Sequence, residues 1–472
     1  MDSFPDEGLV EIADAVALAN ANETFAGLSA AAAAERALQN AEESPVVTDA
    51  VMQNFSGILC EDTVWRAAAS PFVVVQSIIV GGSICGAGNE NVTLTIEPGV
   101  EVRFRRFLSL QVRSELVASG EEDAKIVFTS DERFPAVGDW SGIRFEDTSV
   151  DAELTADGSY MRGSIIEHAR VEYATGGFQK GVVTLTSAAL LKDDELTNNE
   201  DRSNFGILSL ENSTGVRLQG LRVLANSGRG ITTRVPSGGV VDIVDSVVAD
   251  NSQEGLYVFN NGRHLINNSR FEGTSTGIST SSEETLIEES TIAGNRNSGV
   301  VAYGVTHITV SIIRDNIASG IGIGGSGFQI SDSLIVGNGN GVVGGTGAEC
   351  NIARNCFTGN GPAGAGEAMH LSGCTVTENT VVGDRVRFDT QSQITQNNLL
   401  GAPTALEAPA GISPPDYIAS GNWWGTMLDS IIRQRSFDFS DDSSRISVIF
   451  QPIAPAPIPG APDIDLCREG NL

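Results

Sequence analysis

The sequence predicts an all-β fold, a parallel β-helix in which about 22 residues form each turn. From residue 206 onward, a glycine followed by an aliphatic residue recurs at that period, at Gly206, Gly230, Gly255, Gly277, Gly299, Gly320 and Gly341. Asparagine recurs at the same period, at Asn226, Asn251, Asn295, Asn316, Asn338 and Asn360. Because the two series keep one register, each period is predicted to be one structural unit stacked on the next.

Alternation of apolar and polar residues over short runs, as in residues 299–303 and 319–323, predicts the strands of each unit. Three short strands and tight corners fit one turn. Glycine and asparagine are expected at corners that need a positive φ. Asparagine side chains at one register are also expected to stack as a hydrogen-bonded ladder, with turns roughly 4.8 Å apart.

The ends of the chain differ in composition from the repeats. Residues 8–18 and 29–38 favour helix, so residues 1–56 are predicted to be a helical N-terminal extension. The β-helix with its C-terminal cap is predicted over residues 57–453. Residues 454–472 form a Pro-rich tail that is expected to act as an extended linker.

Charge and hydropathy limit the partners. The 472 residues include 60 acidic and 29 basic side chains, giving a net charge of −31. This balance argues against nucleic acid as a partner, because phosphate binding needs clustered Lys and Arg. No run of about 18 apolar residues is present, so no membrane span is expected. The first residues do not resemble a signal peptide.

The cysteines indicate where the protein acts. Cys350 lies ten residues before Asn360, and Cys374 lies ten before Asp384, which takes the asparagine position of the next turn. These two cysteines should stack and form a disulfide. Cys60 and Cys85 are predicted to form a second bridge, and Cys356 and Cys467 are either paired with each other or free. Disulfides imply an oxidising compartment, hence an extracellular or cell-surface protein.

Several segments occur in a characteristic order, at residues 93–104, 116–120, 126–130, 139–145 and 163–174. They are followed later in the chain by the motif Gly421-Asn422-Trp423-Trp424-Gly425-Thr426. Together these segments resemble the pectate-lyase-like group of secreted bacterial right-handed parallel β-helix proteins. The resemblance covers roughly residues 62–453 and implies a right-handed, single-stranded parallel β-helix. Members of this group differ widely in activity, so the resemblance identifies the fold rather than one function.

The outward face of the glycine-marked strands can be read from the alternation. If the residue after each glycine points inward, the outward residues are Leu208, Leu210, Thr232, Arg234, Tyr257, Phe259, Ser279, Ser281, Val301, Tyr303, Gly322, Gly324, Val343 and Gly345. No carboxylate is among them, which excludes the carboxylate pair of a glycosidase from that face. Tyr257, Phe259 and Tyr303 instead predict an aromatic binding stripe, since exposed apolar patches mark interaction sites and aromatic rings stack on sugars. The alternative is that a loop, the N-terminal helices or another subunit covers the stripe.

Charged candidates lie elsewhere. Arg234, Arg263 and His264 are candidate bases, and Glu283, Glu284, Glu288 and Glu289 are candidate calcium ligands. Asp438, Asp441 and Asp442 fit either a calcium site in the C-terminal cap or a turn stabilised by Asp side chains. His168, His307 and His370 are expected to be structural or surface residues.

The sequence therefore predicts an exported binding, adhesive or structural β-helix module, with a polysaccharide or a surface protein as its partner. Self-assembly is compatible with this interpretation. The alternative function is a calcium-assisted polysaccharide lyase or a glycoside hydrolase acting on acidic polysaccharides. Structural calcium is the one cofactor considered.

Overall fold

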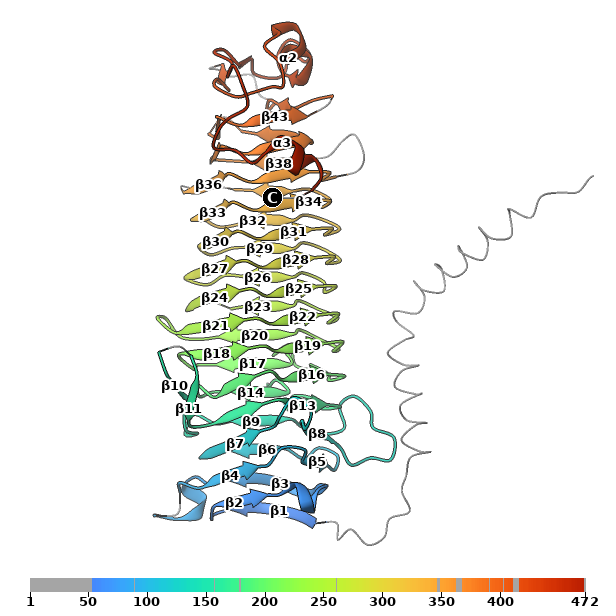
Figure 1. The fold of residues 1–472 in the computed structure, drawn as a ribbon, viewed down its shortest axis with the longest axis vertical. Coiled ribbons are helices and arrows are strands. Elements are labelled where there is room, and N and C mark those ends of the chain that lie inside the picture. Colours follow the sequence, from blue (N-terminus) through green and yellow to red (C-terminus); the bar gives the residue numbers. More distant parts are fainter. Residues whose placement is uncertain are drawn as a thin grey trace, which may run out of the picture. The chain divides into compact units, whose positions relative to one another are not determined.

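A computed structural model describes residues 53–470, except residues 89, 157, 178–179, 260, 346–348, 362–366, 390, 402 and 411–415. It is a parallel β-solenoid of about 15 turns with about 23 residues per turn, which confirms the predicted fold class (Figure 1). The predicted helical extension falls largely on residues 1–52, outside the described part, and β1 (Gln53–Leu59) begins before the predicted boundary at residue 57. Among the described helices, none is long and apolar enough to cross a membrane.

Each regular turn contributes one strand to each of three parallel sheets. Sheet 1 contains the glycine-marked strands β6 (Leu110–Val112), β9 (Ile143–Phe145), β14 (Val183–Leu185), β17 (Leu208–Glu211), β20 (Ile231–Arg234), β23 (Leu256–Val258), β26 (Ile278–Thr280), β29 (Val300–Ala302), β32 (Ile321–Ile323), β35 (Val342–Gly344), β38 (Glu367–Leu371), β41 (Arg385–Phe388), β44 (Leu406–Glu407) and β46 (Ser436–Phe437). Sheet 2 contains β5 (Glu101–Phe104), β8 (Ile126–Ser130), β13 (Ala169–Glu172), β16 (Glu195–Thr197), β19 (Arg222–Leu224), β22 (Val247–Ala249), β25 (Arg270–Glu272), β28 (Thr291–Ala293), β31 (Ile312–Arg314), β34 (Leu334–Val336), β37 (Cys356–Thr358), β40 (Thr380–Gly383) and β43 (Asn398–Gly401).

Sheet 3 has 14 strands. They are β2 (Thr63–Trp65), β4 (Thr93–Ile96), β7 (Glu115–Ser119), β12 (Ile165–Glu167), β15 (Leu190–Lys192), β18 (Val216–Gln219), β21 (Val240–Val244), β24 (Arg263–Asn267), β27 (Glu284–Glu288), β30 (Thr306–Thr309), β33 (Phe328–Ser331), β36 (Cys350–Ala353), β39 (Cys374–Thr377) and β42 (Gln393–Thr395). The long strand β3 (Phe72–Val80) pairs with both β5 and β6 and so joins sheets 1 and 2.

The remaining elements lie outside the three sheets. They are the hairpin β10 (Glu153–Leu154) and β11 (Tyr160–Arg162), the pair β45 (Tyr417–Ile418) and β47 (Val448–Ile449), the helices α2 (Asp429–Arg435) and α3 (Ile464–Arg468), and two short 3-10 turns, Ala67–Ala69 and Ser83–Cys85.

Inward side chains of equivalent strands stack on one another and form a continuous core. On sheet 2, for example, Val248, Phe271, Ile292 and Ile313 are register partners in successive turns, and all are fully buried. Burying an aliphatic or aromatic side chain of this size contributes about 1.5–3 kcal/mol. The core therefore grows along the axis, as the predicted repeat requires.

The predicted asparagine ladder is present at the corner between sheets 2 and 1. The buried Asn295 donates its backbone N–H and its Nδ2 to Oδ1 of Asn316, and Asn316 repeats the pattern onto Asn338. The same ladder also includes Asn199, Asn226, Asn251 and Asn360. Thr274 takes the position between Asn251 and Asn295, and Asp384 is the last member of the ladder. The side chains satisfy buried corner amides that no strand can pair.

A second ladder, at the corner between sheets 3 and 2, was not predicted. Its members are Ser246, Ser269, Ser290, Ser311, Ser333, Asn355, Asn379, Asn397 and Asn422, each accepting the backbone N–H of the residue one turn before. The change from serine to asparagine about halfway along the ladder, between Ser333 and Asn355, hides this series from a search for one residue type.

The expected reason for the regular spacing of glycine is wrong. Gly230, Gly299 and Gly320 do not have a positive φ, and the ladder asparagines do not either. A Cβ atom on Gly299 would lie 2.7 Å from the carbonyl oxygen of Gly320 and 2.8 Å from Nδ2 of Asn316. Glycine is thus needed because the next turn approaches so closely. The left-handed residue is the one before each asparagine, for example Asp315 or Gly337.

All six cysteines lie in the described residues and are paired. The predicted bridges Cys350–Cys374 and Cys60–Cys85 are confirmed, with Cα–Cα distances of 4.6 Å and 5.3 Å. Cys356 and Cys467, which the sequence left open, form a third bridge. Disulfides persist in oxidising compartments, so the three bridges are compatible with an extracellular protein.

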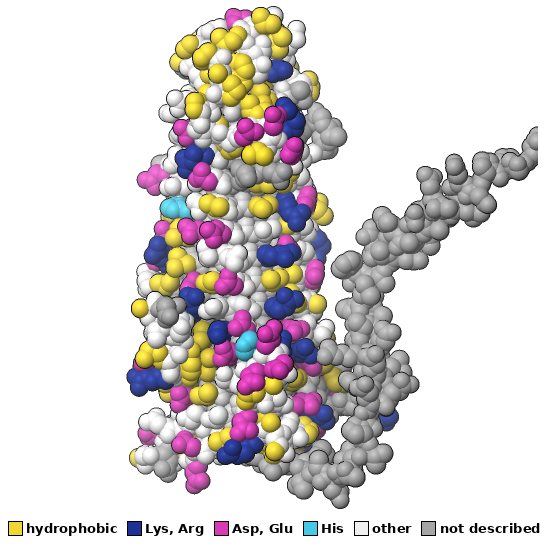
Figure 2. Space-filling view, viewed as in Figure 1, with side chains coloured by type: hydrophobic (Ala, Val, Ile, Leu, Met, Phe, Trp, Pro, Cys, Tyr) yellow, Lys and Arg dark blue, Asp and Glu magenta, His cyan; other side chains and the backbone are white. Residues whose placement is uncertain are grey.

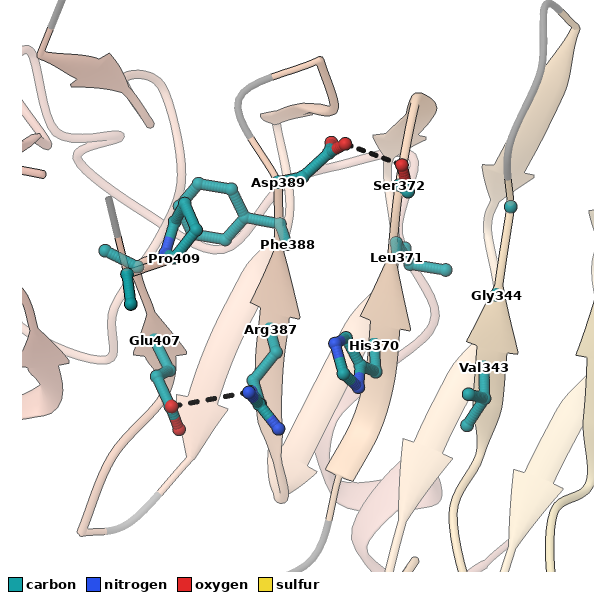
Figure 3. A pocket seen from close by; sticks show the side chains of 13 residues that line it. Val343, Gly344, His370, Leu371, Ser372, Arg387, Phe388, Asp389, Glu407 and Pro409 are labelled. Carbon is teal, nitrogen blue, oxygen red and sulfur yellow. Dashed lines mark hydrogen bonds and ion pairs between the residues drawn. The ribbon is translucent and has the colours of Figure 1, made fainter. Parts of the chain in front are cut away.

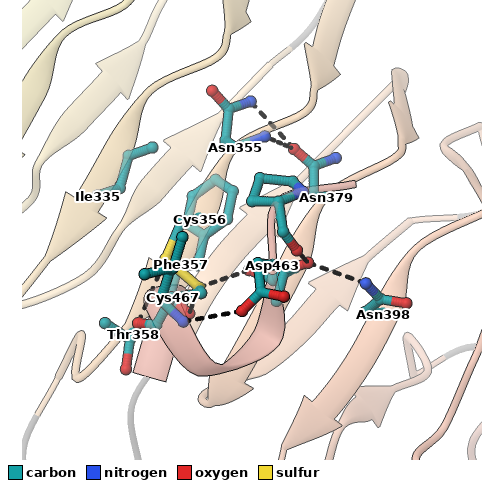
Figure 4. The surroundings of a disulfide bond; sticks show 12 residues. Ile335, Asn355, Cys356, Phe357, Thr358, Asn379, Asn398, Asp463 and Cys467 are labelled. Carbon is teal, nitrogen blue, oxygen red and sulfur yellow. Dashed lines mark hydrogen bonds between the residues drawn. A yellow bond between two sulfur atoms is a disulfide. The ribbon is translucent and has the colours of Figure 1, made fainter. Parts of the chain in front are cut away.

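The third disulfide corrects the prediction for the tail. Residues 454–470, here named the C-terminal strap, do not extend away as a linker but pack back along sheet 2. Thr380 Oγ1 donates to the carbonyl oxygen of Pro462 at 2.6 Å, and Ile458 N donates to Oδ1 of Asn398 at 2.9 Å. The helix α3 then brings Cys467 onto Cys356 (Figure 4).

Substituting Asn316 by alanine should lower the free energy of unfolding by about 2–4 kcal/mol, because both donors of Asn295 lose their buried acceptor. Urea denaturation measures this change. Asn297→Ala is the matched control, since Asn297 is exposed in the same corner, and it should change stability by less than about 0.5 kcal/mol. Equal effects of the two substitutions would contradict the role assigned to the ladder.

Asp384 should make stability depend on pH. Burial raises the pKa of this carboxyl group to about 6, although hydrogen bonds from Asn360 oppose the shift. Because the folded-state pKa lies above the unfolded one, the stabilisation is complete below about pH 4 and is lost as pH rises through about 6. Asp384→Asn should therefore raise the free energy of unfolding at pH 7, by at most about 3 kcal/mol, and change it little at pH 4. A stabilisation of the same size at both pH values would contradict this assignment.

Candidate functional site

The outward face of sheet 1 differs from the prediction at the N-terminal end of the glycine series. Leu208 pairs with Ile231, so Leu208 and Leu210 point inward and are fully buried. Ser209 and Glu211 take the outward positions instead. Gly206 lies one residue out of register because it ends an irregular loop with a φ of 86°. The prediction that no carboxylate lies on this face is therefore wrong.

The predicted residues Tyr257 and Phe259 lie on this face but are half-buried in a stack of rings and guanidinium groups. Arg234 lies between Phe205 and Phe259, 4.1 Å and 4.0 Å from their ring centres, and also pairs with Glu211 at 2.9 Å. Arg229 covers Tyr257 at 4.1 Å. Such stacks stabilise by cation–π attraction, so one face of each aromatic ring is already occupied.

Tyr303, the third predicted residue, directly follows β29 and is 60% exposed. Its ring lies over Gly324 in the next turn, where a Cβ atom would be 2.7 Å from Cδ1. Gly322 lies on the same turn as Gly324 and is half-buried, whereas Gly345 on the following turn is buried. The three predicted aromatic residues thus form two separate features, a covered stack and one open ring beside a floor without side chains.

Beyond Gly345, sheet 1 has an open pocket of about 310 Å³ (Figure 3). Val343, His370, Arg387 and Glu407 lie in one row on β35, β38, β41 and β44, because each is the register partner of the next. Backbone atoms of Gly344 and Gly345 contribute to one side of the pocket, and Phe388 and Pro409 contribute to the other. We name this the C-terminal pocket.

Two buried carboxylates hold the arginines of the pocket in place. Glu367 accepts hydrogen bonds from Arg385 at 2.8 Å and from Arg387 at 3.0 Å. Glu407 lies 3.0 Å from Arg385, 3.4 Å from Arg387 and 3.2 Å from Arg445 of the C-terminal cap. Burial raises the pKa of Glu367, but the hydrogen bonds from Arg387 and Arg385 lower it more, so the net shift is downward.

His370 lies beside this network. Its side chain is 47% exposed, and Nδ1 lies 3.6 Å from Oε2 of Glu367. The carboxylate can therefore orient the imidazole. Asp389, by contrast, accepts hydrogen bonds from Ser372 Oγ and from the backbone of Gly373 and Gln391, and it fixes the adjoining turn.

The other predicted catalytic candidates are not brought together. His264 points into the core and is fully buried, with Nε2 2.8 Å from Thr233 Oγ1, and burial lowers its pKa to about 4. It cannot reach a substrate outside the solenoid. Arg263 lies on sheet 3 and pairs with Glu284, while Arg234 lies on sheet 1.

The predicted acidic calcium ligands on β27 are also apart. Glu283 accepts hydrogen bonds from Ser237 and Gly238, and Glu284 and Glu288 occupy opposite ends of the strand. Within the described residues, a metal-like spacing occurs at Glu167, His168 and Asp193, whose ligand atoms lie within 4.8 Å of one another.

That triad already contains a cation. Lys192 Nζ lies 2.5 Å from Glu167 and 3.9 Å from Asp193. The hydrogen bond to Glu167 raises the pKa of Lys192, which keeps the ammonium charged. A divalent ion would have to displace it, so these residues do not fit a resident metal.

In the C-terminal cap, Asp438, Asp441 and Asp442 accept hydrogen bonds within one turn. Asp438 accepts from Ser440 and from the backbone N–H of Val448, Asp441 accepts from the N–H of Asp438, and Asp442 accepts from Ser444. These contacts favour the turn interpretation over the calcium site, which stays a prediction.

The C-terminal pocket was missed for a physical reason. The glycine series ends at Gly341, because Ala368 and Met369 replace the glycine and valine of the next repeat. The remaining signal was alternation. His370 lies between the apolar residues Met369 and Leu371, and the apolar residues Val386 and Phe388 alternate with Arg385, Arg387 and Asp389. Charged outward positions on two adjacent strands would have marked the site.

No protein family model and no curated protein sequence matches this chain. Among solved structures, the chain is similar to the A-module of mannuronan C-5 epimerase AlgE4 from Azotobacter vinelandii, at 13% identity and a TM-score of 0.25, covering 75% of this chain and 86% of that one. It is also similar to the AlgE6 A-module from the same organism, at 13% identity and a TM-score of 0.28, covering 74% and 89%. At these scores the likeness carries no inference about activity.

Removing calcium should leave the protein's melting temperature unchanged, whereas Asp438→Ala should lower its stability by about 1–3 kcal/mol through the lost hydrogen bonds of the cap. Thermal unfolding with calcium and with chelator, for both proteins, distinguishes the two interpretations. A lower melting temperature in chelator that Asp438→Ala abolishes would show instead that the cap binds calcium.

Proposed function

We propose that this protein is a polysaccharide-binding β-helix module that acts outside the cell or at its surface. The observation that carries the proposal is the C-terminal pocket, where His370 and Arg387 lie side by side and the glycines Gly344 and Gly345 also line the pocket. Sugars are bound by directed hydrogen bonds from polar side chains, often with an aromatic ring stacked on the sugar face. Both elements are present on sheet 1.

The pocket offers donors and acceptors in a fixed arrangement. The guanidinium of Arg387 is held by Glu367 and Glu407, so little side-chain freedom is lost when a ligand binds. His370 offers an exposed imidazole. Along the axis, Val343 of the pocket pairs with Gly322, and Gly324 on the same turn as Gly322 lies under the exposed ring of Tyr303. A polymer, rather than an isolated sugar, fits a surface that extends over several turns.

A catalytic role for the same site is the second candidate. An exposed histidine oriented by a carboxylate is the arrangement of a general base, as a polysaccharide lyase requires. A glycoside hydrolase is less compatible, because its acid must be protonated and the lowered pKa of Glu367 keeps this group ionised. The candidate base is therefore His370, and no metal ligand set adjoins it in the described residues.

Arg387→Gln should weaken polysaccharide binding by about tenfold or more, since hydrogen bonds to charged groups contribute about 1.5–3 kcal/mol. The fold should persist, because Arg385 still pairs with both Glu367 and Glu407. His370→Ala and Tyr303→Ala should also weaken binding. Titration calorimetry or affinity electrophoresis with acidic and neutral polysaccharides measures the effect.

Arg314→Gln is the matched control, because Arg314 is an exposed, ion-paired arginine on sheet 2. It should bind like the unsubstituted protein. Release of unsaturated products that His370→Ala abolishes would establish the lyase instead. If no polysaccharide is retained or cleaved, both functions are wrong.

A further inference from the structure

One corner row of the solenoid contains an anomaly. The row between sheets 3 and 2 has a left-handed residue in each turn from His168 onward, with φ between 45° and 65°. Its described members are His168, Asp193, Gly220, Asp245, Asn268, Glu289, Val310, Asp332, Arg354, Glu378 and Gln396. All are polar or glycine except Val310.

Valine is poorly suited to this position. A β-branched residue with a φ of 49° is sterically disfavoured, whereas Asn and Asp tolerate the left-handed region. Val310 is also 58% exposed, so burial in the core does not compensate for its backbone conformation. Residues held in disfavoured conformations are concentrated at functional sites.

Val310 forms one wall of a second pocket, on the opposite side of the turn from sheet 1. This pocket has a volume of about 490 Å³, and we name it the strap pocket. Ile312 lies beside Val310 on the solenoid, and Ala461, Pro462 and Leu466 of the C-terminal strap form the facing wall. Ile312 and Leu466 are 37% and 46% exposed, so apolar surface stays open on both walls.

The strap wall is held firmly. The disulfide between Cys356 and Cys467, the hydrogen bond from Thr380 to Pro462, and the capping of α3 by Asp463 fix it against sheet 2 (Figure 4). The pocket is therefore preformed, and its volume lies within the range of about 300–1,000 Å³ that small-molecule sites occupy.

The charged groups at the rim limit the ligand further. Arg354 forms two hydrogen bonds with Asp332, at 2.7 Å and 2.8 Å, and this pair neutralises itself. Asp463 adds a carboxylate on the strap side, where it caps α3 and has no ion pair within the described residues. The rim is therefore net negative, which disfavours an anionic ligand.

We propose that the strap pocket binds a small neutral or cationic molecule through one aliphatic or aromatic group packed between Val310, Ile312 and Leu466. This site lies on a different face from the C-terminal pocket and does not depend on the proposed function of that pocket.

Nile red, a neutral apolar dye, should bind at this site with saturable fluorescence, whereas the anionic dye 8-anilinonaphthalene-1-sulfonate should bind at least fivefold more weakly. Val310→Asn should weaken Nile red binding at least fivefold. The variant should fold at least as stably as the unsubstituted protein, because asparagine accepts the left-handed conformation. A folding defect therefore does not obscure the result.

Ile317→Asn is the matched control, since Ile317 is 70% exposed at a different corner. It should leave dye binding unchanged. Replacing both Cys356 and Cys467 by serine should weaken binding by loosening the strap wall. The proposal is wrong if Nile red does not bind saturably, if Val310→Asn binds like the unsubstituted protein, or if Ile317→Asn weakens binding equally.

Discussion

The structure depends on hydrogen bonds that buried corner side chains make from one turn to the next. Strands of each sheet pair with the turns above and below, but a corner has backbone N–H groups that no strand can satisfy. Asparagine at one corner, and serine followed by asparagine at the other, accept these donors and fix the axial register. With that register fixed, outward side chains such as His370 and Arg387 become neighbours although they are distant in the sequence.

The sequence contains enough information to predict the repeat, the three-stranded turn, one ladder and two disulfides, because each is encoded by residues of one type at one spacing. The register of individual strands was harder to predict from the sequence. Gly206 has the residue type of the series but lies one position out of register, and this error removed Glu211 from the outward face. The serine–asparagine ladder changes residue type midway, and the C-terminal pocket lies where Ala368 and Met369 replace the glycine and valine of the repeat, so neither shows as a simple period.

The two candidate sites use the scaffold in different ways. The C-terminal pocket is built from one row of sheet 1, and buried ion pairs with Glu367 and Glu407 orient its arginines. The strap pocket needs two parts of the chain far apart in sequence, which the disulfide between Cys356 and Cys467 joins. On the face in Figure 2, acidic and basic side chains are interspersed along the solenoid. The net charge of −31 therefore does not by itself identify a binding face.

The most direct test of the account follows the imidazole signals of the four histidines by NMR while a polysaccharide is added. His370 lies in the C-terminal pocket, His264 is buried, and His168 and His307 belong to other surfaces. If sheet 1 is the binding face, the signal of His370 shifts saturably and the other three do not. A shift of His168 or His307 with His370 unchanged would contradict the assignment of the site.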